Sequence, residues 1–237
     1  MLGRLLQIVL KYLPLSADKV FTGARMRPRR RYSTGLMSPI SGETGRGECM
    51  KLLSKALASP KLAKYAGDLQ IEGGIMYLAS AVYDSRLFSN AGDCARSRHC
   101  LIVNAGRGAF DRKVDAARKR KSDYVLANRP AALEQLRHEL KLLVKRAEKK
   151  GAKPVVRLNG GSDLDWFELY KEFTMVQFYE YSRDVARVFR LQQLPNVHVT
   201  YSVNEKTTDR ILRAIMGAGI NVAVVFNVKR KKPLPTE

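Results

Sequence analysis

The fold class is decided by residues 155–202, whose sequence is VVRLNGGSDLDWFELYKEFTMVQFYEYSRDVARVFRLQQLPNVHVTYS. The stretch contains three apolar runs rich in Val, Phe and Tyr, a composition that favours strands. Apolar residues at helical spacing lie between these runs. We predict strands at 155–159, 176–181 and 197–202, and helices at 163–173 and 183–193. This alternation predicts right-handed crossovers and a mainly parallel sheet.

The same pattern extends outward in both directions. Downstream we predict a helix at 205–217 and a strand at 222–226, and upstream a strand at 74–79. Three further helices are predicted at 50–65, 111–126 and 130–150. Together these segments predict an α/β fold of repeated βα units with a mainly parallel sheet. We expect it to be barrel-like, a partial or irregular TIM-type barrel, with an open doubly wound sheet as the alternative.

The chain of 237 residues suits one α/β domain with extensions at both ends. Residues 1–48 are expected to form a basic N-terminal extension and linker, and their start also resembles a transit peptide or an amphipathic surface helix. Residues 49–228 are expected to form the domain, and 229–237 a basic tail. No apolar run is long enough to cross a membrane, so we expect a cytoplasmic protein.

Charge is the unusual feature of the composition. The chain has 43 Lys and Arg against 22 Asp and Glu, a formal net charge of +21. Because such a charge attracts phosphate polymers, nucleic acid is the expected partner, with DNA and RNA both open. The alternative is a basic structural or interaction protein. The expected interface is a glycine turn that binds phosphate and the basic helix after it: Gly106, Gly108, Arg107, Arg112, Lys113, Arg118, Lys119, Arg120 and Lys121.

A second hypothesis is an enzyme that acts on a phosphate-bearing substrate. In parallel α/β proteins ligands bind at the carboxyl ends of the strands. The candidate catalytic residues at these ends are Arg157, Asn159, Asp163 and Glu205. An arginine within an apolar strand, such as Arg157, needs a carboxylate partner or a bound anion. Helix capping is the competing explanation for the neighbouring Ser162, Ser182 and Asn204.

The cysteines do not predict a metal site. Cys49, Cys94 and Cys100 lack the paired spacing of a zinc site, even with His99 nearby. They are also too few for a disulfide scaffold, which favours a reducing compartment. The sequence indicates neither a cofactor nor an oligomeric state.

Several segments, in this order, resemble one known family: Asn104-Ala105-Gly106-Arg107-Gly108-Ala109-Phe110, Val156 to Trp166, Val176 to Ser182 and Asn221 to Phe226. The family is that of the uncharacterised phage- and prophage-encoded proteins called "gene product eighty-eight", and the resemblance covers roughly residues 46–228. It implies a phage or mobile-element origin and a place in the host cytoplasm, with no established activity. With the charge, it favours a nucleic-acid-binding protein that acts in replication or genome handling.

The chain departs from the family pattern in two places. Where the family has a three-cysteine loop containing Cys-Pro, only Cys94 and Cys100 are present. Where the family continues into an Asp-rich segment, this sequence ends in the basic stretch that begins at Lys229. We therefore expect a truncated or diverged member.

Overall fold

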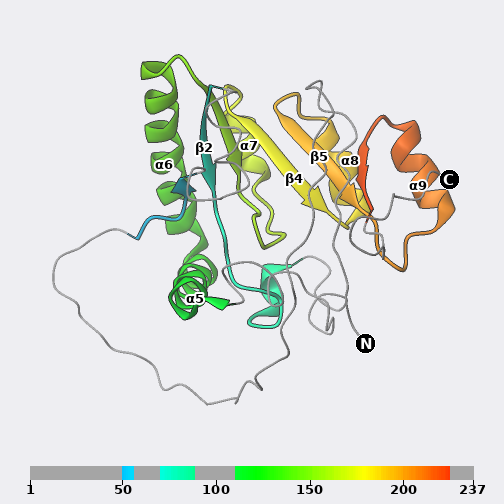
Figure 1. The fold of residues 1–237 in the computed structure, drawn as a ribbon, viewed down its shortest axis with the longest axis horizontal. Coiled ribbons are helices and arrows are strands. Elements are labelled where there is room, and N and C mark those ends of the chain that lie inside the picture. The colour runs from blue at the N-terminus through cyan, green and yellow to red at the C-terminus, as the bar shows by residue number, and fades with distance from the viewer. Residues whose placement is uncertain (1–49, 56–69, 89–109, 225–237) are drawn as a thin grey trace, which may run out of the picture.

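The computed structural model describes residues 50–55, 70–88 and 110–224, and its strands form one six-stranded sheet (Figure 1). The strands lie side by side in the order in which the chain forms them. The first pair is antiparallel and every later pair is parallel. The strands are β1 (Ser54–Lys55), β2 (Ile71–Ile75), β3 (Lys153–Arg157), β4 (Gln177–Ser182), β5 (Val197–Ser202) and β6 (Asn221–Ala223).

The predicted α/β fold with a mainly parallel sheet is confirmed. The strand predicted at 197–202 has the observed bounds of β5, and β3 and β4 lie within two residues of their predictions. The strand predicted at 74–79 ends earlier, at Ile75, because its partner strand β3 ends at Arg157 and the chain bends at Leu158. Among the described residues the sheet is open, with β1 and β6 at its edges, and no closed barrel forms.

The helices begin and end at residues that satisfy their free backbone groups. The carboxylate of Asp111 accepts bonds from the backbone N–H groups of Lys113 and Val114 at the start of α5. Asn128 ends α5 and also caps α6, whose first turn contains Pro130. The helical elements are η2 (Ser85–Leu87), α5 (Arg112–Ala127), α6 (Arg129–Lys149), α7 (Phe167–Glu172), α8 (Val185–Gln192) and α9 (Asp209–Gly217).

The helix predicted at 50–65 is wrong in its described part, where Ser54 and Lys55 form β1. The backbone N–H groups of Leu52 and Leu53 donate to the two carboxylate oxygens of Glu139, at 2.8 and 2.7 Å. These bonds and the pairing with β2 stabilise an extended backbone there. A contact with α6, more than eighty residues away, has therefore overridden the local helical pattern.

The helices cover one face of the sheet. Each step from one parallel strand to its neighbour crosses over in the same sense, so successive helices lie on the same side. Register places Gly74, Val156, Phe178 and Val197 in one row across β2 to β5 on that side. Leu143 of α6 approaches this row at Gly74, and the ring of Tyr170 in α7 packs on Phe178 with centroids 4.8 Å apart.

The opposite face carries different chemistry. Because side chains alternate along a strand, the row of Ile75, Arg157 and Tyr179 lies on the side away from the helices. Tyr181 and His198 share this side, and the His198 ring bonds with the Asn221 side chain at 2.9 Å. The sheet therefore has an apolar face under helices and a polar, aromatic face opposite.

Gly160 allows the chain after β3 to pass close to the chain after β2. Its N–H donates to the carbonyl oxygen of Met76 at 2.9 Å. A Cβ at this position would lie 2.6 Å from the same oxygen and 2.8 Å from side-chain atoms of Ile75 and Tyr77. Since one of these contacts is with backbone, only glycine fits there.

We predict that Gly160→Ala lowers the free energy of unfolding by about 1–3 kcal/mol, because the two chain segments must separate to accept a methyl group. Gly217→Ala, at the end of α9 where a Cβ meets nothing within 4 Å, is the matched control and should leave stability unchanged or slightly higher. Urea unfolding of both variants measures the difference. Equal stability of the two would contradict the tight approach.

Candidate functional site

Asn159 organises the loop at the carboxyl end of β3. Its buried side-chain oxygen accepts hydrogen bonds from Ser162 Oγ at 2.9 Å, Leu164 N at 3.0 Å and Trp166 Nε1 at 3.2 Å. Its Nδ2 donates to the Leu164 carbonyl at 2.9 Å and to Glu180 Oε1 at 3.3 Å. An amide with every donor and acceptor occupied positions its neighbours and has little capacity left for a substrate.

Glu180 is a carboxyl group within the apolar layer between the sheet and its helices. Its side chain is 1% exposed, and Oε1 accepts hydrogen bonds from the hydroxyl of Tyr170 and from Asn159. Oε2 is also buried and has no hydrogen-bond partner in the described part of the chain. Burial raises the pKa of this carboxyl, and the positive charge of Arg187 opposes the rise only in part.

Asp163 lies beside this buried group and is tied to α8. Its carboxylate pairs with Arg187 Nε at 3.1 Å, and Ser182 Oγ donates to it at 3.3 Å. Arg187 also donates to the carbonyls of Asp163 and Leu164, at 3.2 and 2.8 Å. The structure thus brings the predicted residues Asn159 and Asp163 together. It adds Tyr170, Glu180 and Arg187, which the sequence analysis did not select.

A hollow of about 460 Å³ opens next to this network, at the carboxyl edge of the sheet. Phe88, Leu164 and Phe167 contribute apolar wall. Its lining holds three Arg and three Asp residues, of which Arg187 pairs with Asp163 and Arg190 with Asp165, the latter at 2.9 Å. The hollow is therefore close to neutral and does not favour a strongly anionic ligand.

The other two predicted catalytic residues lie elsewhere. Arg157 is on the opposite face of the sheet, with its guanidinium carbon 4.8 Å from the ring centre of Tyr181 and 5.9 Å from that of Tyr179. Its Nε is buried without a hydrogen-bond partner among the described residues. Glu205 is exposed between β5 and α9. The four residues therefore do not form one site.

The basic helix α5 divides its predicted nucleic-acid-binding residues into two groups. Lys121 is used internally, since its Nζ donates to the Leu52 carbonyl at 2.8 Å. The guanidinium of Arg118 lies 4.9 Å from the ring centre of Tyr77, and Lys119 pairs with Asp115 at 3.0 Å. The exposed remainder are Arg112, Lys113 and Arg120.

Part of the predicted interface lies outside the described residues, namely Gly106, Arg107 and Gly108. At the start of α5, the carboxylate of Asp111 already accepts bonds from the first free N–H groups. The negative charge of that carboxylate opposes phosphate binding at this helix end.

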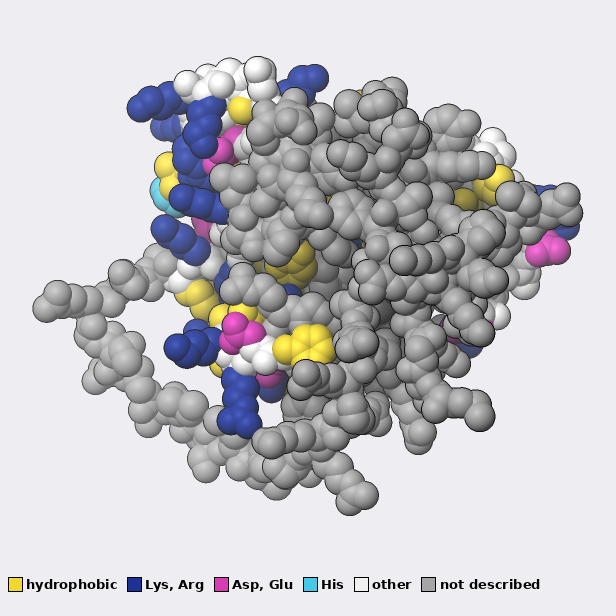
Figure 2. Space-filling view, in the orientation of Figure 1, with side chains coloured by type: hydrophobic (Ala, Val, Ile, Leu, Met, Phe, Trp, Pro, Cys, Tyr) yellow, Lys and Arg dark blue, Asp and Glu magenta, His cyan; other side chains and the backbone are white. Residues whose placement is uncertain are grey.

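Three lysines that the sequence analysis did not select extend the basic surface along α6. Lys141, Lys145 and Lys149 are exposed and recur every four residues, so they form a row on the side away from the buried Leu136 and Leu140. Figure 2 shows Lys and Arg side chains gathered along α6 and α5. In the sequence, these lysines could have been identified by their i, i+4 spacing on the side of the helix opposite its leucines.

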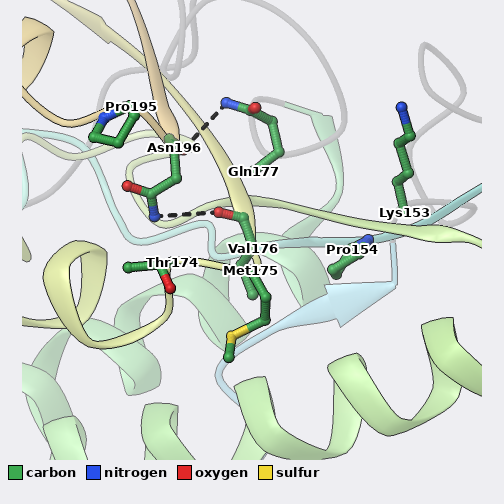
Figure 3. A pocket seen from close by; sticks show the side chains of 8 residues that line it. All are labelled: Lys153, Pro154, Thr174, Met175, Val176, Gln177, Pro195 and Asn196. Carbon is green, nitrogen blue, oxygen red and sulfur yellow. Dashed lines mark hydrogen bonds between the residues drawn. The ribbon is translucent and has the colours of Figure 1, made fainter.

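A second hollow, of about 430 Å³, lies at the amino ends of β3 and β4 (Figure 3). Asn196 points into its wall, but its Nδ2 donates to the carbonyls of Tyr170, Phe173 and Val176. Gln177 donates to the Asn196 carbonyl at 3.1 Å. These polar groups connect loops to the sheet, and this edge is not where parallel sheets place ligands.

No helix in the described ranges is long and apolar enough to cross a membrane. The residues described also contain no group of three or more His, Cys, Asp or Glu side chains that could hold a metal ion. Cys49, Cys94 and Cys100 lie outside them.

We predict that Glu180→Gln stabilises the protein at neutral pH. Since the folded state raises the pKa of this carboxyl above its ordinary value of 4.5, its favourable contribution is complete below that value and is lost as pH rises through the folded-state pKa. Gln does not ionise, so the Tm advantage of the variant should grow from about pH 4 to about pH 8. The exposed Glu205→Gln is the control. A constant difference across this range would refute the assignment.

The comparisons with known proteins place the chain in a family. No curated protein and no solved structure matches it. One family model, described as Gene product 88, matches residues 55–237. These residues include the strands from β2 to β6, the network around Asn159 and Glu180, and the basic helices α5 and α6. The chain therefore belongs to the Gene product 88 family.

Proposed function

We propose that the protein binds nucleic acid through the exposed cations of α5 and α6. This basic surface is defined as Arg112, Lys113, Arg120, Lys141, Lys145 and Lys149. The observation that carries the proposal is that these six side chains are exposed and have no ion-pair partner among the described residues.

Other cations of α6, and Lys150 directly after it, have partners. Arg146 and Lys150 both pair with Glu72, at 3.0 and 2.7 Å, and these pairs lower the pKa of Glu72 against the opposing effect of its burial. Arg137 contacts Glu134 and Glu172. Their charges are largely compensated, so the attraction for phosphate comes from the unpaired set.

The geometry of the unpaired set suits an extended polyanion. Lys141, Lys145 and Lys149 form a row about 12 Å long, because an α-helix rises about 1.5 Å per residue. Residues 111–150 hold thirteen Lys and Arg against six Asp and Glu, so the field over this surface is positive. Phosphate contacts of this kind bind without sequence preference.

The chain belongs to a family that the sequence resemblance associates with phages. Together with the basic surface, this supports a role in genome handling or replication in the host cytoplasm. We also propose that this open sheet is part of a barrel-like fold, because its neighbouring parallel strands follow one another in chain order, as they do in a (β/α)8 barrel.

An enzyme that acts on a phosphate-bearing substrate is the second candidate. Glu180 favours it, because a buried carboxyl with a raised pKa, next to a hollow at the carboxyl edge, is a common feature of active sites. Against it, Arg157 and Glu180 lie on opposite faces of the sheet and cannot meet in one pocket.

The test compares three triple variants that remove equal charge. The first changes Arg112, Lys113 and Arg120 to Gln, and the second changes Lys141, Lys145 and Lys149 to Gln. The control changes Arg183, exposed after β4, and Arg210 and Arg213, exposed on α9, to Gln; α9 lies at the opposite end of the sheet from α6 (Figure 1). Binding of labelled duplex DNA and RNA is measured by fluorescence anisotropy across a salt series.

We expect the first two variants to weaken binding and to flatten the log–log salt dependence by up to roughly 3, since each lost phosphate contact removes about 0.9. The control should bind nearly as wild type. If all three variants lose affinity equally, only net charge matters and the localised surface is wrong. If wild type binds neither duplex, the proposed function fails.

A further inference from the structure

The face of the sheet away from the helices contains an arginine with no ion-pair partner in the ranges 50–55, 70–88 and 110–224. Arg157 lies in a row with Ile75 and Tyr179, and its guanidinium stands over the ring of Tyr181 at 4.8 Å. No ion pair or hydrogen bond joins its side chain to any described residue, and its Nε is buried. Glu180, whose pKa the charge of Arg157 helps to lower against the effect of burial, is on the other side of β4 with Tyr170 and Asn159.

A second arginine lies at the carboxyl end of the neighbouring strand. Arg118 of α5 lies over the ring of Tyr77, which follows β2, and its Nε is likewise buried without a partner in the described part of the chain. Burial lowers the pKa of Arg118, with Tyr77 and Asp115 opposing. Burial raises the pKa of Tyr179 to about 12, Arg157 opposes the rise, and Tyr77 is close enough to add to it.

These five side chains, Tyr77, Arg118, Arg157, Tyr179 and Tyr181, therefore form one neighbourhood, here called the Arg–Tyr face. Each of the two half-buried guanidinium groups has a buried Nε without a hydrogen-bond partner among the described residues, and a bound anion offsets the cost of leaving such a group unbonded. Stacking on a ring uses the flat side of a guanidinium and leaves its N–H edge free for a bidentate bond to phosphate. Tyrosine rings and guanidinium planes are also the surfaces on which nucleobases stack.

We propose that the Arg–Tyr face binds a nucleotide unit, with its phosphate on Arg157 and Arg118 and its base stacked against Tyr179 and Tyr181. Two sources supply this unit: a single strand of nucleic acid or a free mononucleotide. A duplex does not, because its bases are already stacked within the helix. The site is separate from the basic surface, which contacts phosphates alone, and its position at the carboxyl edge of the strands is where parallel sheets bind ligands.

The experiment uses the full chain and three probes: labelled oligothymidylate, AMP, and a labelled DNA duplex. Wild type is compared with Arg157→Gln, Arg157→Lys and Tyr179→Leu, and Arg183→Gln, exposed after β4, is the control of equal charge. Thermal unfolding of each variant verifies that it is folded. Anisotropy measures the oligonucleotide and the duplex, and calorimetry measures AMP.

We expect Arg157→Gln and Tyr179→Leu each to weaken oligothymidylate or AMP binding about tenfold, the effect of losing one stacked or phosphate contact. Arg157→Lys should recover only part of this loss, since an ammonium group keeps the charge but not the planar edge. Duplex affinity and the Arg183→Gln control should change little. If these variants bind only oligothymidylate more weakly, the source is a single strand of nucleic acid. If they also bind AMP more weakly, the source is a free mononucleotide.

The proposal is overturned if neither probe binds wild type, or if both bind Arg157→Gln and Tyr179→Leu as tightly as wild type. Its failure is distinct from that of the basic surface. Duplex affinity that depends on the lysines of α6, together with oligothymidylate and AMP binding that is unchanged in Arg157→Gln and Tyr179→Leu, would uphold the proposed function and reject the Arg–Tyr face. The reverse pattern would do the opposite.

Discussion

The structure depends on the pairing of each parallel strand with the next strand along the chain. Since every crossover turns in the same sense, this order requires the helices of β2 to β6 to gather on one face. The apolar residues of α6, α7 and α8 are then buried together against that face, with Trp166, Tyr170 and Phe178 as its largest fully buried rings. The other face lacks this cover from the described helices, and its side chains are accordingly polar and aromatic.

The network of Asn159 and Glu180 shows how a polar group is accommodated on the covered face. Asn159 closes the loop after β3 with bonds to Ser162, Leu164 and Trp166, and it also meets Glu180. A buried carboxyl is costly unless its oxygens are satisfied, and here only one is bonded within the described residues. Through its bonded oxygen, Glu180 joins Asn159 of the loop after β3 to Tyr170 of α7.

The high positive charge has several distinct roles in the fold. Lys121 connects α5 to the segment before β1, and Arg129 covers the Trp166 ring with its guanidinium carbon 3.5 Å from the ring centre. Arg146 and Lys150 neutralise Glu72. Within the described part of α5 and α6, the cations that remain exposed or stacked on tyrosines are the ones available to a polyanion. Net charge alone therefore overstates the binding surface.

Local patterns in the sequence were sufficient for most elements. The alternation of apolar strands with amphipathic helices predicted β3 to β5 and α5 to α9 within a few residues, because periodicity and capping are local properties. The helix predicted at 50–65 is replaced by β1 in its described part, because the hydrogen bonds that hold the backbone there come from the distant Glu139. The residues of the Arg–Tyr face could not be grouped in advance, since Tyr77, Arg118 and Arg157 meet only when the sheet forms.

The sequence by itself thus determined the α/β class, the mainly parallel sheet, the family and the cationic character of the chain. The tertiary structure decided which of those residues share a surface. Arg157 and Asn159 stand two positions apart, yet a bend at Leu158 sends them to opposite sides of the sheet. Arg118 and Lys121 belong to the same basic run as Arg120, but packing turns them inward while Arg120 stays exposed. Side-chain direction follows from packing between distant segments, and one-dimensional spacing does not contain that information.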